Sequence, residues 1–249
     1  QSKMALKKFI VCGDNHGDLV SHESVKKLIQ FRDEWMPRGG HMVCVGDIFD
    51  MGSLRKGASD EERQRGISED FQAGIRFLDL GFKFLTLGNH DQRLWQAAET
   101  SSNGILKEHC VDLAEAAERE FKKRKIKWAP YHVGKYLTLP EGGPKFLHGF
   151  VAGQYPATGM HSVYGDCIFG HVHSPSTFNA KRIDGGQAFS LGCMADIEQM
   201  TYCERQPGRL KWRNGFGFGF ICEKTGKWNF WNISKDPETG DWISPMGIL

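Results

Sequence analysis

The chain has 249 residues, of which 40% are hydrophobic and 25% charged, and its formal net charge is +2. This composition is sufficient for a buried core, so it excludes a disordered chain. So small a charge balance neither requires nor excludes a nucleic-acid partner. No apolar stretch approaches the roughly 20 residues of a membrane span, and the first residues lack the pattern of a signal peptide, so we expect no membrane association.

The first half of the chain alternates short apolar strands with helices. From runs of β-branched and aromatic residues we expect strands at 8–12, 41–45 and 82–87. From apolar residues at helical spacing we expect helices at 21–35 and 60–80. Strand and helix in alternation predict parallel β-α-β units. Glycine and polar residues follow each strand, at the edge where such sheets bind ligands.

The second half begins with a predicted amphipathic helix at 103–125 and is then rich in strands. We expect these strands at 126–129, 134–139, 145–148, 167–169, 188–191, 215–222 and 227–233. With no linker or repeat in between, the chain is expected to form a single domain over 4–235. Two prolines and a glycine in the last residues predict an irregular tail over 236–249.

Cysteine usage points to a reducing compartment. The seven cysteines are odd in number and form no CxxC pair, so neither a disulfide framework nor a cysteine-based zinc site is predicted. Most of them sit inside apolar runs, where cysteine behaves as a small hydrophobic residue. We therefore expect a cytoplasmic protein.

Five short segments are dense in residues that bind metal ions. They are Gly13-Asp14-Asn15-His16-Gly17, Gly46-Asp47-Ile48-Phe49-Asp50, Gly88-Asn89-His90-Asp91, Leu147-His148-Gly149 and Gly170-His171-Val172-His173. Each stands at the end of a predicted strand, so we expect all five to converge on one edge of a sheet. Carboxylates, an amide and imidazoles together suit Mn²⁺, Fe²⁺ or Zn²⁺ better than Ca²⁺. Any one segment alone is readily explained as a turn or helix cap, but the five together favour a shared metal site.

In this order the segments resemble the signature of the calcineurin-like metallophosphoesterase superfamily. That signature is Asp-x-His, Gly-Asp-x-x-Asp, Gly-Asn-His-Asp or Gly-Asn-His-Glu, a single His, and Gly-His-x-His. The resemblance covers about two-thirds of the chain, from Asp14 to His173. It implies an α/β fold, a four-layer α/β/β/α sandwich with two packed mixed sheets, in which the strand-rich second half supplies the other sheet. It also implies hydrolysis of a phosphate ester with two divalent metal ions.

The resemblance assigns roles to individual residues. The ligands implied for the first metal are Asp14, His16, Asp47 and His173. The ligands implied for the second are Asp47, Asn89, His148 and His171, so that Asp47 bridges the two ions. Mn²⁺ is the favoured metal, with Fe²⁺, Zn²⁺, Ni²⁺ and Co²⁺ as alternatives. His90 matches the catalytic histidine of the family; Asp91 would orient it, and Asp50 would support the loop or a ligand histidine.

Departures from the family's sub-patterns bear on the substrate. Protein phosphatases of the family carry an arginine after Gly-Asp-x-x-Asp and end the third motif in glutamate, whereas this chain has Met51 and Asp91. That arginine would help to bind the extra negative charge of a phosphate monoester. Without it, we expect the site to favour a diester, which carries less charge. The segment Trp212-Arg213-Asn214-Gly215-Phe216 resembles one found in bacterial and phage nuclease-like members. We therefore expect a phosphodiesterase that acts on nucleic acid or nucleotides, with DNA or RNA among its partners.

Two basic runs fit such a partner. They comprise Arg119, Lys122, Lys123, Arg124, Lys125 and Lys127, and then Arg205, Arg209, Lys211 and Arg213. Basic residues near tryptophans suit a phosphate backbone with stacked bases, although a solvated helix face explains the first run slightly better. A phosphomonoesterase resembling the protein phosphatases is the alternative enzyme. A non-catalytic binding scaffold is disfavoured because the chain keeps every ligand residue. The sequence predicts no oligomeric state.

Overall fold

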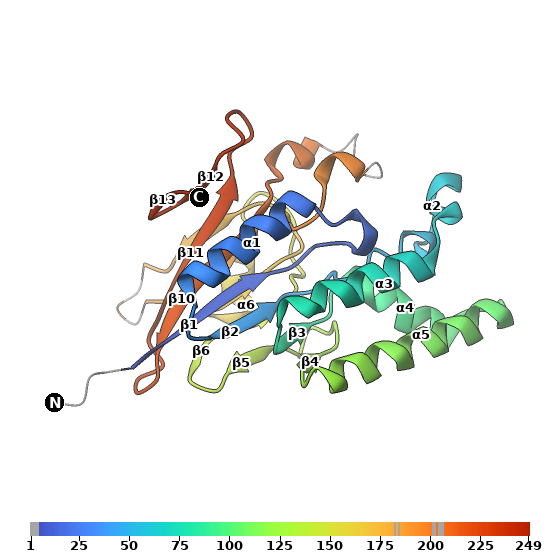
Figure 1. The fold of residues 1–249 in the computed structure, drawn as a ribbon, viewed down its shortest axis with the longest axis horizontal. Coiled ribbons are helices and arrows are strands. Elements are labelled where there is room, and N and C mark those ends of the chain that lie inside the picture. The colour runs from blue at the N-terminus through green and yellow to red at the C-terminus, as the bar shows by residue number, and fades with distance from the viewer. Residues whose placement is uncertain (1–4, 182, 184, 201–202, 204–206) are drawn as a thin grey trace.

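Two β-sheets pack face to face in the computed structural model, and helices cover their outer faces (Figure 1). The structure describes residues 5–181, 183, 185–200, 203 and 207–249. The larger sheet contains, in spatial order, β13 (Gly247–Ile248), β12 (Trp242–Ser244), β11 (Trp228–Lys235), β10 (Gly215–Cys222), β1 (Leu6–Cys12), β2 (His41–Cys44), β3 (Phe84–Thr86) and β4 (Lys127–Ala129). Strands β1, β2 and β3 are parallel, as predicted. Strand β4 continues them in parallel, and β10 joins β1 in antiparallel pairing.

The second sheet is also mixed. Its spatial order is β5 (Leu137–Leu139), β6 (Gly142–Leu147), β7 (Cys167–Phe169), β9 (Gln187–Ser190) and β8 (Ser176–Asn179). As expected, the second half of the chain supplies this sheet. Strands β4 and β10 to β13 also come from the second half, yet they extend both edges of the first sheet.

Helices α1 (His22–Trp35) and α5 (Gly104–Lys123) lie close to their predicted bounds. The helix expected at 60–80 is instead divided into α2 (Asp60–Gln64), α3 (Ile67–Phe77) and a 3-10 turn, because the chain is extended at Arg65 and Gly66. Two helices were not predicted, α4 (Asn89–Thr100) and α6 (Pro156–Tyr164).

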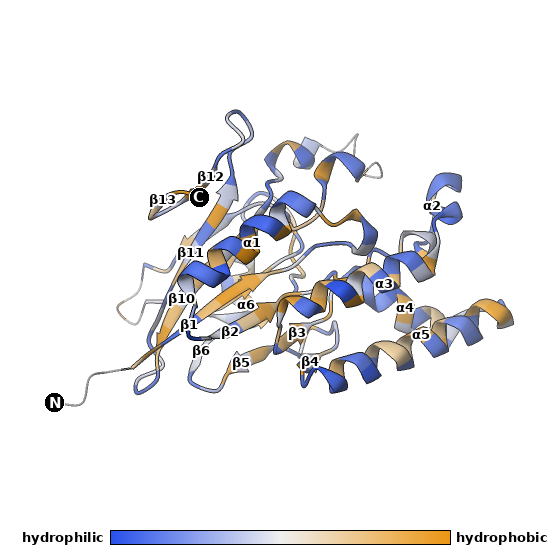
Figure 2. Cartoon of the chain, viewed as in Figure 1, coloured by the Kyte–Doolittle hydropathy of each residue, from blue (hydrophilic) through white to orange (hydrophobic). Residues whose placement is uncertain are grey.

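The alternating side chains of β1 show how the four layers form. Phe9 and Val11 belong to the core between the two sheets, whereas Ile10 and Cys12 belong to the core beneath the helices. Successive residues of a strand point to opposite faces, so a strand buried on both faces is apolar throughout. Figure 2 shows this contrast between apolar strands and helices with polar outer faces. A third core packs α6 on the second sheet, which completes the expected four-layer sandwich.

The C-terminal residues are not the irregular tail that their prolines suggested. Trp242 is 1% exposed, and β12 pairs with β11 while β13 pairs with β12. The prolines lie outside these strands, so they do not interrupt pairing. All seven cysteines are buried thiols. Within the described residues, no helix is both long enough and apolar enough to cross a membrane.

Candidate metal centre

The five segments converge at the carboxyl ends of strands from both sheets. Asp14 follows β1, Asp47 follows β2 and Asn89 follows β3 in the larger sheet. His148 directly follows β6, and His171 follows β7 in the smaller one. Because the two sheets face each other, one edge of the sandwich gathers ligands from both, as the sequence predicted.

The first group of ligands consists of Asp14, His16 and His173. Nε2 of His16 lies 3.2 Å from Nε2 of His173, which in turn lies 3.3 Å from Oδ1 of Asp14. All three side chains are buried, and their donor atoms lie within 4.8 Å of one another. Two imidazole nitrogens this close, next to a carboxylate, fit a shared metal ion with bonds of about 2.0–2.2 Å.

The second group consists of Asn89, His148 and His171. Oδ1 of Asn89 lies 3.0 Å from Nε2 of His148 and 2.9 Å from Nδ1 of His171. The other ring nitrogen of His148 lies 2.8 Å from the backbone oxygen of Val45, to which it donates when protonated. Such a hydrogen bond fixes the tautomer of a metal-binding histidine and leaves the opposite nitrogen to the metal.

Asp47 lies between the two groups. Its Oδ2 is 3.2 Å from Nε2 of His148 and 3.9 Å from Nε2 of His16. Its Oδ1 accepts the backbone N–H of His90 in the first turn of α4, at 2.8 Å, where the helix dipole favours a negative charge. The donor set therefore fits two divalent ions that share Asp47.

Many of these ligands adopt a strained backbone conformation. Five of the seven have a positive φ, namely Asp14, His16, Asp47, His171 and His173. Each such residue costs on the order of 1–3 kcal/mol, and such residues cluster at functional sites. Hydrogen bonds between the loops hold the conformation, because the N–H of Asp14 donates to Gly46 at 2.8 Å and that of His16 to Asp47 at 2.9 Å.

The motif glycines allow the ligand loops to approach one another closely. A Cβ atom on Gly88 would lie 2.0 Å from Oδ1 of Asp47, and one on Gly170 would lie 2.4 Å from Oδ2 of Asp14. No side chain fits at either distance, so these positions require glycine.

Burial and neighbouring charges shift the pKa values of several of these ligand residues. Burial opposes the ionisation of Asp47, but His148, His90 and His16 together outweigh burial and lower the pKa of Asp47 well below its usual range. Burial, together with the neighbouring His148, lowers the pKa of His171 to about 4, so this imidazole is neutral and can bind metal. For His148, burial acts downward, but Asp47 raises the pKa to about 9. A metal ion must therefore displace a proton from His148.

His90 lies beside the ligands, and Asp50 orients it. Nδ1 of His90 is 3.1 Å from Oδ1 of Asp50 and 3.0 Å from the Asp50 backbone oxygen. The same Oδ1 lies 3.1 Å from Nδ1 of His16, so Asp50 contacts the histidine that it was expected to support. Arg93, which the sequence analysis missed, donates to the Asp50 backbone oxygen at 2.9 Å and lies 3.0 Å from Nδ1 of His90.

The role expected for Asp91 is corrected by these contacts. One of its oxygens accepts the N–H of Phe49 at 2.8 Å, and the other accepts the N–H of Gly88 at 2.7 Å. The buried carboxylate thus caps α4 and ties it to the loop after β2, while the carboxylate that holds His90 is that of Asp50. Burial and the charge of Asp47 raise the pKa of Asp91 well above its usual range.

Two further residues that the sequence analysis missed hold Asp50 in place. Arg65 places Nη1 3.0 Å from Oδ2 of Asp50 and also pairs with Asp18. Asp70, on α3, accepts the N–H of Asp50 at 2.9 Å and that of Met51 at 2.5 Å. Asp70 is a charged residue on the buried face of α3, within the helix expected at 60–80. That position was the one sequence feature that could have indicated its role.

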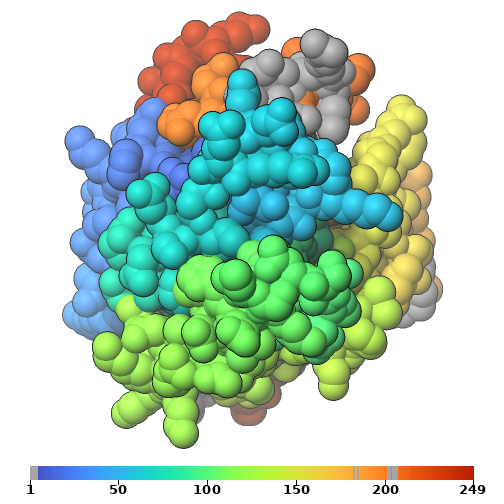
Figure 3. All heavy atoms as spheres, turned by 90° about the vertical axis from the view of Figure 1, so that its right-hand side faces the viewer, coloured from blue at the N-terminus to red at the C-terminus, as the bar shows by residue number. Residues whose placement is uncertain are grey.

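A cavity of about 920 Å³ opens over the ligands. Asp47, His90, His171 and His173 line it, together with residues from segments 152–156 and 208–213. Figure 3 shows this end of the molecule, with the region of α2 in cyan, α5 in green and residues around α6 in yellow. Trp212 packs against His173 with ring centroids 4.3 Å apart, so it forms part of the wall beside the metal ligands.

The two basic runs lie in different places. The run at 119–127 ends where β4 begins, opposite the carboxyl ends that carry the ligands (Figure 1). Within it, Arg124 pairs with Asp79 and Glu120, as expected of a solvated helix face. In the second run, Lys211 and Arg213 line the cavity over the ligands. Arg205 lies outside the described residues.

The match to a protein-family model agrees with this donor set. The family model for calcineurin-like phosphoesterases matches residues 7–183. Among solved structures, the chain is similar to the hypothetical protein PH1004 from Pyrococcus horikoshii OT3, with 11% sequence identity, 90% of this chain and 86% of that chain covered, and a TM-score of 0.39. A comparison with curated proteins gives no match.

Proposed function

The chain belongs to the calcineurin-like phosphoesterase family of metal-dependent phosphoric ester hydrolases, and on that premise we propose that it is a dinuclear phosphodiesterase acting on nucleic acid or nucleotides. The observation that carries the proposal is the position of Asp47. Its carboxylate faces His148 in one ligand group and His16 in the other. One carboxylate between two such groups is the arrangement that a pair of ions needs.

The chemistry divides between the ions and the chain. Two bound ions would lower the pKa of a water and offset charge on the phosphate oxygens. His16, His173 and Asp14 would hold one ion, while Asn89, His148 and His171 would hold the other. We assign to His90, which lines the cavity, the transfer of a proton to the leaving oxygen.

Two features support a diester substrate. Met51 stands where related protein phosphatases carry an arginine, so the residue after Asp50 supplies no guanidinium for the extra charge of a monoester. The nearby guanidinium of Arg93 already donates to the Asp50 backbone oxygen. The cavity does have cations on its rim, Lys211 and Arg213, which can attract an anionic chain from solution. Mn²⁺ suits the mixed oxygen and nitrogen donors, and Fe²⁺, Zn²⁺, Ni²⁺ and Co²⁺ suit them as alternatives.

A substrate panel tests the proposal. The enzyme, stripped with a chelator and reloaded with Mn²⁺, is assayed on bis-p-nitrophenyl phosphate, p-nitrophenyl phosphate, a single-stranded oligonucleotide and a duplex. We expect Mn²⁺-dependent hydrolysis with a higher kcat/KM for the bis ester than for the monoester, and cleavage of at least one nucleic acid. A higher kcat/KM for p-nitrophenyl phosphate would favour the phosphomonoesterase alternative. No hydrolysis with any metal would favour the scaffold.

A further inference from the structure

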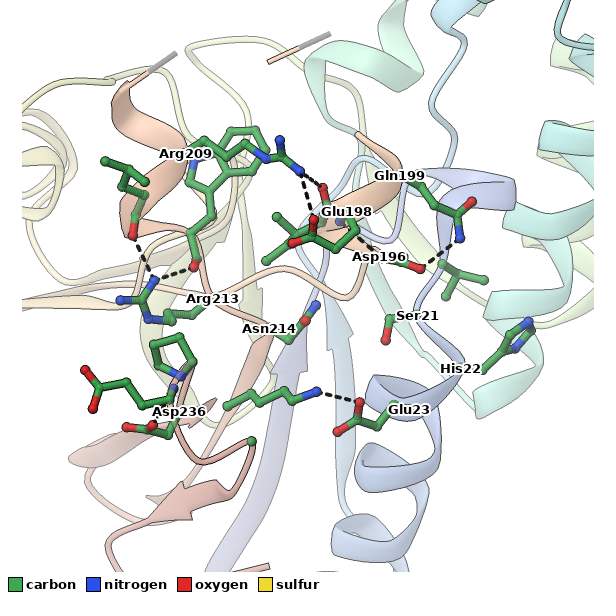
Figure 4. Close-up of a pocket in the computed structure, with 18 of the residues that line it drawn as sticks. Ser21, His22, Glu23, Asp196, Glu198, Gln199, Arg209, Arg213, Asn214 and Asp236 are labelled. Carbon is green, nitrogen blue, oxygen red and sulfur yellow. Dashed lines mark hydrogen bonds and ion pairs between the residues drawn. The ribbon is translucent and has the colours of Figure 1, made fainter. Parts of the chain in front are cut away.

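Trp212 separates two cavities of opposite character. The first is the cavity over the metal ligands. The second has a volume of about 1210 Å³ and lies on the other side of the same segment, since Leu210, Trp212 and Arg213 line both. Its remaining wall comes from the N-terminus of α1, the 3-10 helix η4 (Ile197–Gln199) and the turn after β11 (Figure 4). A substrate chain that continued past Trp212 would enter this second cavity.

The second cavity is acidic. The described residues lining it include six carboxylates and three cations of lysine or arginine. The carboxylates are Asp18, Glu23, Asp196, Glu198, Asp236 and Glu238. Asp18 is also paired with Arg65, which lies outside the lining. The remaining formal excess of two negative charges repels a phosphodiester chain.

Two of the three cations offer a phosphate little, because each already has a partner. Lys235 lies 2.6 Å from Glu23, and Arg209 donates to the backbone oxygen of Ile197 at 2.7 Å. Arg213, which donates to the backbone oxygens of Leu210 and Trp212 at 3.0 and 2.7 Å, lines both cavities, so its charge does not distinguish them. An anion entering here would have to displace these contacts.

The N-terminus of α1 does not turn the acidic second cavity into a binding site for phosphate. Helix N-termini attract anions, but the hydroxyl of Ser21 already accepts the N–H of Ser24, at 3.2 Å. The carboxylate of Glu23 stands in the first turn, where a phosphate would otherwise bind. The helix end is therefore already capped and neutralised by its own chain.

The cavity over the metal ligands has the opposite balance. Among the described residues that line it, Asp47 is the one carboxylate, while Lys211 and Arg213 are cations. The ions proposed above would make it still more positive. Leu210 is 81% exposed and lies beside Trp212 at the boundary between the cavities, where it offers an apolar surface to a base.

From this asymmetry we infer that the enzyme cleaves phosphodiesters at the end of a nucleotide chain or in a short nucleotide, and not those in the interior of a long chain. The inference rests on the proposed function. The scissile phosphate binds at the metal ligands, and the terminal nucleoside lies against Leu210 and Trp212. We call the carboxylates that line the second cavity the acidic wall. This wall repels the next phosphate, so the chain cannot continue past Trp212.

Covalently closed substrates test the inference directly. The Mn²⁺ enzyme is given a single-stranded DNA oligonucleotide in linear form and the same sequence as a closed circle, together with a dinucleoside monophosphate. We expect kcat/KM for the circle to be lower by about tenfold or more, as repulsion worth about 1.4 kcal/mol would give. Cleavage of the dinucleotide but not of the linear strand would assign the site to short nucleotides, and cleavage of both would assign it to chain ends. Equal cleavage of circle and linear strand would overturn the inference.

A charge-reversed enzyme tests the wall itself. Glu198 is 91% exposed and Glu238 is also exposed, so replacing both in a Glu198→Lys, Glu238→Lys variant should not disturb folding. We expect this variant to cleave the circle several-fold faster than the wild type at low salt, and the gain to disappear at high salt. No gain, or an equal gain in a Glu34→Lys, Glu223→Lys control at the opposite end of the sheet, would overturn the role of the wall.

Failure of the inference and failure of the proposed function give different results. If the circle is cleaved as fast as the linear strand while bis-p-nitrophenyl phosphate is hydrolysed, only the inference fails. If bis-p-nitrophenyl phosphate is not hydrolysed with any of the five candidate metals, the proposed function fails first.

Discussion

Oδ1 of Asp50 lies 3.1 Å from Nδ1 of His90, and the same oxygen lies 3.1 Å from Nδ1 of the metal-ligand histidine His16. One carboxylate oxygen thus positions both the ring that would bind metal and the ring that would transfer a proton. Arg65 and the N–H contacts to Asp70 hold Asp50 from the other side. Metal binding and turnover should therefore respond together when Asp50 is changed.

Replacement of Asp50 by asparagine should weaken metal binding and slow turnover. Loss of the carboxylate removes the acceptor that orients His16, and changes of this kind cost about 10–100-fold in metal affinity or activity. Mn²⁺ titration and kcat at saturating Mn²⁺ measure the two effects. Asp33→Asn, on the exposed face of α1, serves as the control. Unchanged metal affinity and unchanged kcat would show that Asp50 positions neither histidine.

Replacement of His90 by alanine should leave the metal ions in place and reduce kcat. General acid groups contribute about 10²–10⁴-fold, and His90 lines the cavity without belonging to either ligand group. Metal analysis of the purified variant, together with kcat on bis-p-nitrophenyl phosphate, separates the two functions. Full activity would contradict the role given to His90, as would loss of metal from the variant.

A Gly88→Ala substitution should disrupt the centre through sterics alone. The added methyl group would lie 2.0 Å from Oδ1 of Asp47, so either the carboxylate or the start of α4 must move. We expect weaker Mn²⁺ binding and a lower melting temperature. Gly104→Ala is a matched control, since nothing lies within 4 Å of its added Cβ. If both variants bind Mn²⁺ like the wild type, the ligand loops are not as closely packed as described.

Asp70 should make stability depend on pH. Burial, with the charge of Asp50 adding to it, raises the pKa of Asp70 to about 7, above its value in an unfolded chain. The stabilisation linked to this group is therefore complete below about pH 4 and is lost as the pH rises through about 7. Urea unfolding of the metal-free protein between pH 5 and 8 should show a free energy of unfolding that falls with pH more steeply in the wild type than in Asp70→Asn. Equal slopes would contradict the shift.

Much of the fold and most of the site could be predicted from the sequence. The buried strands β1, β2 and β3 are short apolar runs, and the residues after them must meet because parallel strands end at one edge. All seven predicted metal ligands lie at that edge. The sequence did not indicate which sheet each later strand would join, because an apolar strand such as β10 fits the core of either sheet.

The misassigned role of Asp91 has a geometric cause. His90 and Asp91 are consecutive residues of α4, a helix that the sequence analysis did not predict. Neighbouring helix positions point about 100° apart, so adjacent side chains do not face each other. The carboxylate that reaches His90 comes from Asp50, 40 positions away in the chain. Partners such as Arg65 and Asp70 depend on how α2 and α3 pack, which no local motif encodes.

The count of metal ions per chain tests the central claim most directly. Metal-stripped protein is equilibrated with excess Mn²⁺, separated from free ions, and analysed for bound metal, with Asp47→Ala treated in parallel. We predict two Mn²⁺ ions per wild-type chain and the loss of both in the variant, because Asp47 lies between the two ligand groups. One ion or none in the wild type, or two ions retained by Asp47→Ala, would contradict a dinuclear centre built on this residue.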